Sequence, residues 1–216
     1  MPTPQQKTKQ WARQHTHDEF VKKSKHDGYR SRAAYKLEEI AQDHQLFKNV
    51  TNILDLGCAP GSWSQFVLNK TPNTRVVGVD LLEIDPIQNK RFNFIQGDFT
   101  DQETQNRILQ TFYDANNRSI ELIMSDMSPN LTGNAHVDQA KMEDLAIQVL
   151  DYCKLIIEQN NNVCESAHLS CLIKLFHGMH FNNVVKYANT IFNHVKTIKP
   201  KASRDKSREC YLLMRP

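Results

Sequence analysis

A single lysine within an apolar, strand-like run is the most informative residue of this chain. Lys174 lies in the segment Cys171-Leu-Ile-Lys-Leu-Phe176, whose other side chains are apolar or a cysteine thiol. A lysine is almost never fully buried unless a partner holds it, and a lysine in such surroundings can serve as a base. The pattern therefore predicts a functional lysine rather than a core residue.

Acidic residues stand where several predicted strands end. They are Asp55, Asp80, Asp98 and Asp126. Ligands of an open α/β sheet bind beyond the carboxyl ends of its strands, and the first of these turns, Asp55–Trp63, opens a helix whose N-terminus favours negative groups. Its glycines, at 57 and 61, do not form the Gly-x-Gly-x-x-Gly of a dinucleotide fold. An adenosine ligand without phosphates, such as S-adenosylmethionine (SAM), fits better, with Asp80 placed to accept from ribose hydroxyls.

A second group of candidates combines two lysines with two carboxylates. These residues are Lys36, Asp126, Lys174 and Glu209. Such a group can neutralise itself, which makes partial burial tolerable, and it suits the orientation or deprotonation of a hydroxyl nucleophile. This chemistry needs no metal ion. Taken alone, Lys36 and Glu209 also fit ordinary surface positions.

Length and composition favour one sizeable domain. The chain has 216 residues, 39% of them hydrophobic and 24% charged, which suits a single α/β domain with a full core. Its five cysteines form no Cys-x-x-Cys pair, which favours free buried thiols over a disulfide framework or zinc site. We find neither a membrane-spanning run nor a secretory signal. The expected location is the cytoplasm, or the mitochondrial matrix for an organelle homologue.

Basic residues gather near both ends of the chain. Residues 1–36 carry nine Lys and Arg against three acids, and Lys196–Arg208 carries six against Asp205 alone. This asymmetry indicates a polyanionic partner, although a solvated tail and loop remain alternatives. We expect residues 1–30 to form a basic, partly flexible RNA-binding extension and residues 31–216 to form the catalytic domain.

Strand-like and helix-like stretches alternate along the rest of the chain. The predicted strands are Asn52–Leu56, Arg75–Asp80, Phe92–Gln96, Ile120–Ser125, Leu169–Leu175, Val195–Ile198 and Cys210–Met214. A first helix is predicted to begin at Ser31, which would be its N-cap. Four further helices are predicted at Ser62–Asn69, Gln102–Tyr113, Val137–Glu158 and Asn182–Phe192. This order predicts a doubly wound, mostly parallel sheet whose last two strands form an antiparallel edge pair. The polar stretch Gln159–His168 is predicted to be a surface loop.

Several motifs together resemble one enzyme family. They are Ser31-Arg-Ala-Ala-Tyr-Lys-Leu37, Asp55-Leu-Gly-Cys-Ala-Pro-Gly-Ser-Trp-Ser-Gln65, Val79-Asp-Leu-Leu82, Gln96-Gly-Asp-Phe99, Ser125-Asp-Met-Ser-Pro-Asn130 and Ser207-Arg-Glu209. From about Trp11 to Met214 the chain resembles the FtsJ-like (RrmJ-type) family of ribose 2′-O-methyltransferases. The resemblance is strongest to members that act on large-subunit ribosomal RNA.

The resemblance implies a fold, a cofactor and a set of site residues. The fold is a Rossmann-like SAM-dependent methyltransferase sheet of seven strands, mostly parallel with an antiparallel last strand, and with helices on both faces. The implied catalytic residues are Lys36, Asp126, Lys174 and Glu209. The implied SAM-binding residues are Gly61, Trp63, Asp80, Asp98 and Asp126.

The chain departs from the family pattern at three places outside the four catalytic candidates. Ser62 replaces a common second glycine, Cys58 replaces an alanine, and the stretch Gln159–His168 lacks the usual Pro-Gly turn before the lysine strand. Because Ser62 adds a side chain beside the cofactor turn, we expect this departure to affect the cofactor affinity before any other property.

We therefore expect a SAM-dependent enzyme that methylates a ribose 2′-hydroxyl, of a uridine, in 23S-type ribosomal RNA and thereby supports ribosome assembly. Its expected partner is ribosomal RNA in the large subunit, with no DNA or membrane partner, and it is expected to act as a monomer. Alternatives are a tRNA or mRNA-cap ribose 2′-O-methyltransferase, or a ribosome-assembly RNA-binding factor with a dispensable activity. A cap enzyme should carry a guanine-stacking aromatic pair, for which the sequence gives no clear candidate.

Overall fold

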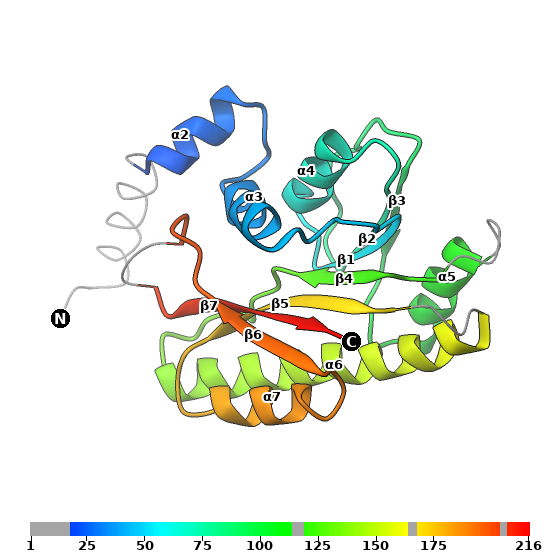
Figure 1. The fold of residues 1–216 in the computed structure, drawn as a ribbon. Helices are drawn as coiled ribbons and strands as arrows, with labels where there is room; N and C mark the ends of the chain where they lie inside the picture. The colour runs from blue at the N-terminus through cyan, green and yellow to red at the C-terminus, as the bar shows by residue number, and fades with distance from the viewer. Residues whose placement is uncertain (1–17, 114–118, 164–167, 204–206) are drawn as a thin grey trace.

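The computed structural model describes residues 18–113, 119–163, 168–203 and 207–216 (Figure 1). The strands are β1 (Asn52–Leu56), β2 (Arg75–Asp80), β3 (Phe92–Gln96), β4 (Leu122–Ser125), β5 (Ser170–Phe176), β6 (His194–Ile198) and β7 (Glu209–Arg215). The helices are α2 (Glu19–His26), α3 (Ala33–His44), α4 (Ser62–Lys70), α5 (Gln102–Tyr113), α6 (Ala135–Val163) and α7 (Phe181–Ala188).

The strands form one seven-stranded sheet in the order β3-β2-β1-β4-β5-β7-β6. Strands β3, β2, β1, β4 and β5 pair in parallel, whereas β7 runs antiparallel to both β5 and β6. The predicted sheet class and its antiparallel last strand are confirmed. The central strands are buried on both faces, which is why they read as nearly continuous apolar runs in the sequence.

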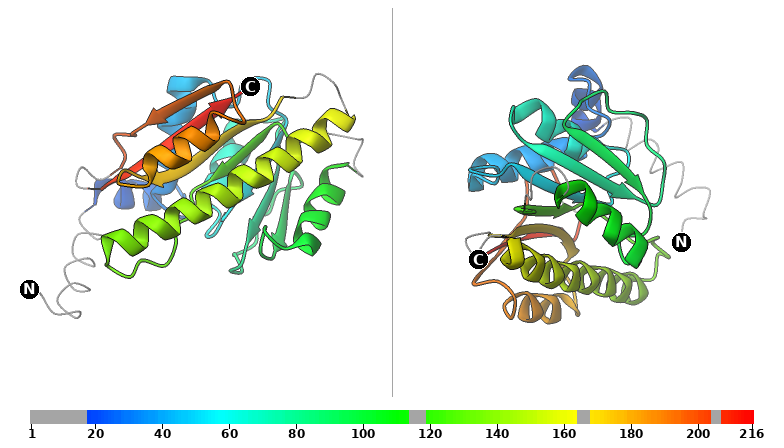
Figure 2. Two further views of the ribbon diagram at one scale, coloured as in Figure 1. Left: turned by 90° about the horizontal axis from the view of Figure 1, so that it is seen from below. Right: turned by 90° about the vertical axis from the view of Figure 1, so that its right-hand side faces the viewer.

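Helices cover both faces of the sheet (Figures 1 and 2). Successive strand side chains point to opposite faces, so Leu122 and Met124 pack with α3 and α4 while Ile123 packs with α5, α6 and α7. The same alternation in β5 places Leu172 on the α3 and α4 side. Lys174, two residues further on, shares that face.

The helix α2 packs beside α3. Asp18 caps it through a hydrogen bond from the Phe20 backbone N–H to Oδ1 (3.1 Å), and Val21 is buried beneath it. The Tyr35 hydroxyl of α3 donates to Asp27 Oδ2 at 2.8 Å. Part of the predicted N-terminal extension is therefore an ordered, capped helix, and residues 1–17 lie outside the described part of the chain.

Two local predictions were wrong. The helix α3 begins at Ala33 with Arg32 as N-cap, and Ser31 Oγ instead accepts from the Ala33 N–H at 3.2 Å. The predicted loop Gln159–His168 is helical up to Val163. Asn160 explains the difference, because it is 1% exposed and bonds both backbone groups of Ile120, accepting from N at 3.1 Å and donating to O at 2.7 Å. Residues 164–167 are not described.

Of the helices in the described ranges, none combines the length and the apolar character that crossing a bilayer requires. The four cysteines in these ranges are buried and free: Cys58, Cys153, Cys171 and Cys210. Cys164 lies outside them.

Candidate active site

Lys174 and Asp126 meet at the carboxyl ends of two neighbouring strands. Parallel pairing sets Ser125 of β4 opposite Ile173 of β5, so the residue after β4 lies beside Lys174. Lys174 Nζ is 3.1 Å from Asp126 Oδ1 and also donates to the Asp126 carbonyl oxygen. With only 7% of its surface exposed, Lys174 is buried and paired. The cation within an apolar strand thus has its partner on the adjacent strand.

Lys36 and Glu209 form a second ion pair. Lys36 Nζ, from α3, lies 2.7 Å from Glu209 Oε1 at the start of β7, and both side chains are mostly buried. The Ser203 hydroxyl donates to the same carboxylate oxygen at 2.8 Å. Glu39, also on α3, accepts from the backbone N–H groups of Lys201 and Ala202, so the helix holds the loop that precedes β7.

Tyr211 joins the two ion pairs. It lies opposite Lys174 in the β5–β7 register, and its hydroxyl donates to Asp126 Oδ1 at 2.8 Å. Its ring centroid lies 6.0 Å from Lys36 Nζ. Burial raises the pKa of the Tyr211 phenol well above its usual value, and the Asp126 charge adds to this, so the hydroxyl remains a donor.

Sequence reasoning missed Tyr211. Tyr211 lies within the predicted strand Cys210–Met214 and is not among the predicted site residues. The available signal was the two-residue period of a strand, which puts Tyr211 on the same face as Glu209 and therefore beside the predicted catalytic residues.

The four charges of the cluster cancel, and the side chains that carry them are mostly buried. Two lysines face two carboxylates, each within a direct ion pair. Removing one partner of such a partly buried pair leaves an uncompensated charge, which costs more than the pair itself contributes. Chemically, the cluster offers donors and acceptors that can hold a hydroxyl group and accept its proton.

A cavity of about 610 Å³ adjoins this cluster. Three predicted cofactor residues line it: Asp80, Asp98 and Asp126. The turn after β1 contributes Gly57 and Ala59, and the loop after β4 and helix α6 contribute the opposite wall, including Asn130 and Lys141. Ligand pockets of proteins have volumes of roughly 300–1,000 Å³, so the cavity can enclose a nucleoside-sized ligand.

Backbone N–H groups fix the two acids of this cavity that follow β2 and β3. Asp80 accepts from Ala59 N at 2.8 Å and from Leu82 N at 2.9 Å, one bond to each carboxylate oxygen. Asp98 Oδ1 accepts from the N–H and the hydroxyl of Thr100, at 2.9 and 2.7 Å. Their orientation therefore depends on the loops that follow the strands.

Gly57 leaves room for the Met127 side chain at the wall of the cavity. Its φ is +70°, and a Cβ built on it would lie 1.9 Å from the Met127 Cγ atom. Any larger residue would displace the Met127 side chain, which lines the same cavity.

Gly61 and Trp63 stand apart from the cavity lining. Gly61 is the N-cap of α4, with a φ of +102°. Trp63 is 3% exposed, donates from Nε1 to the Ala33 carbonyl at 2.9 Å and packs against the Tyr211 ring, with the ring centroids 5.8 Å apart. Trp63 thus packs against the ring of Tyr211. Its contact with the cofactor stays a prediction.

Asp55, grouped above with the other strand-end acids, is fully buried. Its Oδ2 accepts from the Ser64 hydroxyl of α4 at 2.6 Å. Burial raises the pKa of its carboxyl to about 7, against the opposing effect of the Ser64 bond. The structure therefore assigns Asp55 to the support of the first turn, outside the cavity lining.

The two substitutions in the first turn have local explanations. The Ser62 hydroxyl donates to Ser31 Oγ at 2.7 Å, so this side chain is bonded towards the start of α3. Burial raises the pKa of the Cys58 thiol far above its usual value, and the nearby Asp55 and Asp80 add to this. Cys58 therefore behaves as a small uncharged residue.

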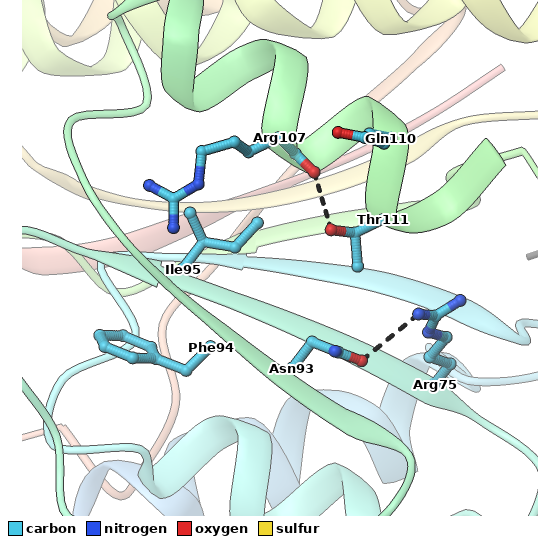
Figure 3. Close-up of a pocket in the computed structure, with 7 residues that line it drawn as sticks. All are labelled: Arg75, Asn93, Phe94, Ile95, Arg107, Gln110 and Thr111. Atoms are coloured by element: carbon cyan, nitrogen blue, oxygen red, sulfur yellow. Dashed lines mark hydrogen bonds between the residues drawn. The ribbon is translucent and has the colours of Figure 1, made fainter. Parts of the chain in front are cut away.

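A second hollow, of about 580 Å³, follows the free edge of β3 (Figure 3). Its arginines are bonded within the chain: Arg75 Nη2 lies 3.4 Å from Asn93 Oδ1, and Arg107 Nη1 donates to the Gln96 carbonyl at 3.0 Å. It contains no candidate catalytic residue. Within the described ranges there is also no cluster of three or more His, Cys, Asp or Glu side chains that could hold a metal ion.

Comparison with known proteins agrees with this arrangement. The chain is 41% identical over 207 residues to "Ribosomal RNA large subunit methyltransferase E" of Methylobacillus flagellatus, covering 95% of this chain and 94% of the relative. The protein of the same name from Herminiimonas arsenicoxydans is 40% identical over 212 residues, covering 95% and 93%.

Solved structures show the same fold. A crystal structure assigned as a ribosomal RNA methyltransferase from Plasmodium falciparum matches with a TM-score of 0.71 and 29% identity, over 87% of this chain and 97% of that one. The sequence profile of the FtsJ-like methyltransferases matches residues 29–215. The chain therefore belongs to the FtsJ-like methyltransferase family.

Proposed function

We propose that this protein transfers a methyl group from SAM to a ribose 2′-hydroxyl, of a uridine, in large-subunit ribosomal RNA. The observation that carries the proposal is the pair of lysine–carboxylate ion pairs joined by Tyr211 and set beside the cavity. The substrate follows the relatives, which are named as large-subunit ribosomal RNA methyltransferases.

The residues around the cavity fit SAM. Asp80, held by two backbone N–H groups, would accept from the ribose hydroxyls, and Asp98 would accept from a second donor of the cofactor. The missing Cβ at Gly57 lets the Met127 side chain pack against this turn, where both residues line the cavity. Bound SAM supplies an electrophilic methyl group.

The chain's own task is to hold and deprotonate the acceptor hydroxyl. Lys174 and Asp126 orient the 2′-hydroxyl for in-line attack, and this alignment can supply a large share of the rate. Lys174 acts as the base or as the group that orients the hydroxyl, and Asp126 holds Lys174 in place through their ion pair. Lys36 and Glu209 position the ribose and keep the site neutral. Because DNA lacks the 2′-hydroxyl, this chemistry selects RNA.

The N-terminal residues supply the contact with the RNA backbone. On α2, Lys22, Lys23 and Lys25 are exposed while Val21 faces the protein. Residues 1–30 then act as the RNA-binding extension of a catalytic domain formed by residues 31–216, and the enzyme works as a monomer.

Deleting residues 1–17, with three Lys and Arg, should flatten the salt dependence of RNA binding. Its substrate places the reaction where ribosomes are made, in the cytoplasm or the mitochondrial matrix.

Product chemistry tests the proposal. Large-subunit particles are incubated with the protein and SAM tritiated in the methyl group, and the labelled RNA is hydrolysed in alkali. A methylated 2′-oxygen cannot attack the neighbouring phosphate, so the label should remain in alkali-resistant dinucleotides. Label in mononucleotides would mean that a base is methylated, and the ribose assignment would be wrong.

A further inference from the structure

Arg30 joins two loops that lie far apart in the sequence. Its Nη1 atom donates to the Pro60 carbonyl at 2.8 Å and to the Asp85 carbonyl at 2.6 Å. Its Nη2 atom donates to the Pro86 carbonyl at 2.9 Å. Three carbonyls of two irregular segments are thus satisfied by one guanidinium, whose planar fork suits such simultaneous bonding.

The backbone around Arg30 is itself fixed to α4. The Arg30 N–H donates to Gln65 Oε1 at 3.1 Å, and Gln65 Nε2 donates to the Gly28 carbonyl at 2.8 Å. A Cβ built on Gly61 would lie 2.9 Å from Arg30 Nη1, so the arginine rests on the N-cap of that helix. The backbone that carries the guanidinium is therefore fixed to α4.

Both loops that Arg30 holds lead from the cofactor cavity. Pro60 follows Ala59, whose N–H bonds Asp80, and Asp85 follows the segment that begins with Leu81 and Leu82. Ala59, Asp80, Leu81 and Leu82 all line the cavity. Asp80 is held by one N–H from each of these two loops. Tying the loops together therefore fixes the carboxylate between them.

We propose that Arg30 is a positioning residue for the cofactor, which acts through the loops on either side of Asp80 and does not itself contact SAM. The inference rests on the proposed function, because it assigns SAM to this cavity. Attraction between charges cannot be the way in which Arg30 favours SAM binding, because SAM carries a net positive charge and a nearby cation would oppose its binding. Arg30 also lies four residues after α2, so the predicted RNA-binding extension is anchored at the cofactor site.

A second arginine provides a matched control. Arg91 also donates three hydrogen bonds to backbone carbonyls: from Nη1 to Thr71 (2.6 Å) and Thr74 (2.8 Å), and from Nη2 to Leu68 (2.7 Å). Its partners lie at the opposite end of α4, away from the cavity lining. Arg91→Ala loses the same kind of bond at the far end of the β2–β3 connection, next to β3, and leaves the bonds of Ala59 and Leu82 to Asp80 in place.

The experiment measures SAM affinity by titration calorimetry, and the kinetic constants for methyl transfer, on wild type, Arg30→Ala, Arg30→Lys and Arg91→Ala. Arg30→Ala should bind SAM about tenfold more weakly, with KM for SAM raised by a similar factor and kcat at saturating SAM within about threefold of wild type. Arg30→Lys keeps the positive charge but not the planar guanidinium, so its SAM affinity should lie between those of wild type and Arg30→Ala. Arg91→Ala should lower the melting temperature yet bind SAM as wild type does.

The outcomes separate the two proposals. If Arg30→Ala binds SAM within about twofold of wild type, or if Arg91→Ala weakens SAM binding equally, the positioning role is overturned. A wild-type protein that binds SAM but methylates no large-subunit RNA would refute the proposed substrate only, and the Arg30 comparison would still decide the inference. A wild-type protein that binds no SAM would refute both.

Discussion

The catalytic cluster and the cofactor cavity are neighbours that are held together in different ways. In the cluster, side chains from α3, β5, β7 and the end of β4 bond one another directly, and Tyr211 connects them. In the cavity, Asp80 and Asp98 are held by backbone N–H groups of the loops that follow the strands. In the proposed mechanism, chemistry thus depends on a few side chains that bond one another, whereas SAM affinity depends on loop conformation. Apart from Asp126, which belongs to both, substitutions in the cluster should therefore change the rate and substitutions in the cavity should change SAM binding.

The largest effect is expected from Lys174→Ala. The substitution removes the group that orients the hydroxyl and leaves Asp126 without its cation, so methyl transfer should fall at least about a thousandfold. SAM affinity should change little, because Lys174 does not line the cavity. Single-turnover transfer and calorimetry on the same preparation measure both. Residual transfer within about tenfold of wild type would remove Lys174 from the mechanism.

Asp80→Ala should show the reverse pattern. Loss of a carboxylate that accepts from ribose hydroxyls costs roughly 1.5–3 kcal/mol, or about 10- to 150-fold in SAM affinity. The rate at saturating SAM should stay close to that of wild type, because the ion pairs of the cluster are untouched. Calorimetry with SAM provides the affinity, and unchanged binding would show that the cofactor lies elsewhere.

Tyr211→Phe should have an intermediate effect on the rate. It removes one neutral donor to Asp126 while keeping the ring that packs on Trp63. A hydrogen bond to a charged acceptor contributes roughly 1.5–3 kcal/mol, which predicts a loss in kcat of about 10- to 150-fold with SAM affinity preserved. A variant with unchanged kcat would show that Tyr211 serves only to pack the core.

The last prediction concerns stability and not catalysis. The Asp55 carboxyl, with a pKa raised to about 7 by burial, keeps its proton in the folded protein below that pH, whereas in the unfolded chain it ionises near pH 4. Folding thus takes up a proton between these pH values. The contribution of Asp55 is fully present below about pH 4 and is lost as pH rises towards 7, by up to about 1.4 kcal/mol per unit.

Asp55→Asn removes that pH dependence and can keep the bond from Ser64. Its melting temperature, relative to wild type, should therefore rise between pH 5 and pH 8. Glu158→Gln, an exposed change on α6, is the control. A difference between Asp55→Asn and wild type that stays constant over this range would mean that Asp55 is ionised in the folded state.

The sequence predicted the sheet well because parallel, buried strands read as apolar runs with little ambiguity. The strands β1, β2 and β3 have the predicted bounds. The position of Lys174 beside Asp126 also followed, since both lie at strand ends on the same edge of the sheet. Local pattern and sheet geometry were sufficient for these features.

Other features depend on contacts between distant residues. The asparagine run in Asn160–Asn162 is polar, yet Asn160 is buried by its bonds to Ile120, so α6 extends further than its composition suggests. Arg30 likewise reads as one more basic residue, although it bonds carbonyls at positions 60, 85 and 86. No local pattern encodes such pairings.

The most direct test of the proposed function is a comparison of acceptors. Large-subunit particles, free tRNA and capped RNA are offered separately and in competition, with tritiated SAM and wild-type enzyme. We expect large-subunit RNA to take up label far faster than the other two and to retain it as alkali-resistant dinucleotides. If free tRNA or capped RNA outcompetes the large subunit, the ribosomal assignment is contradicted.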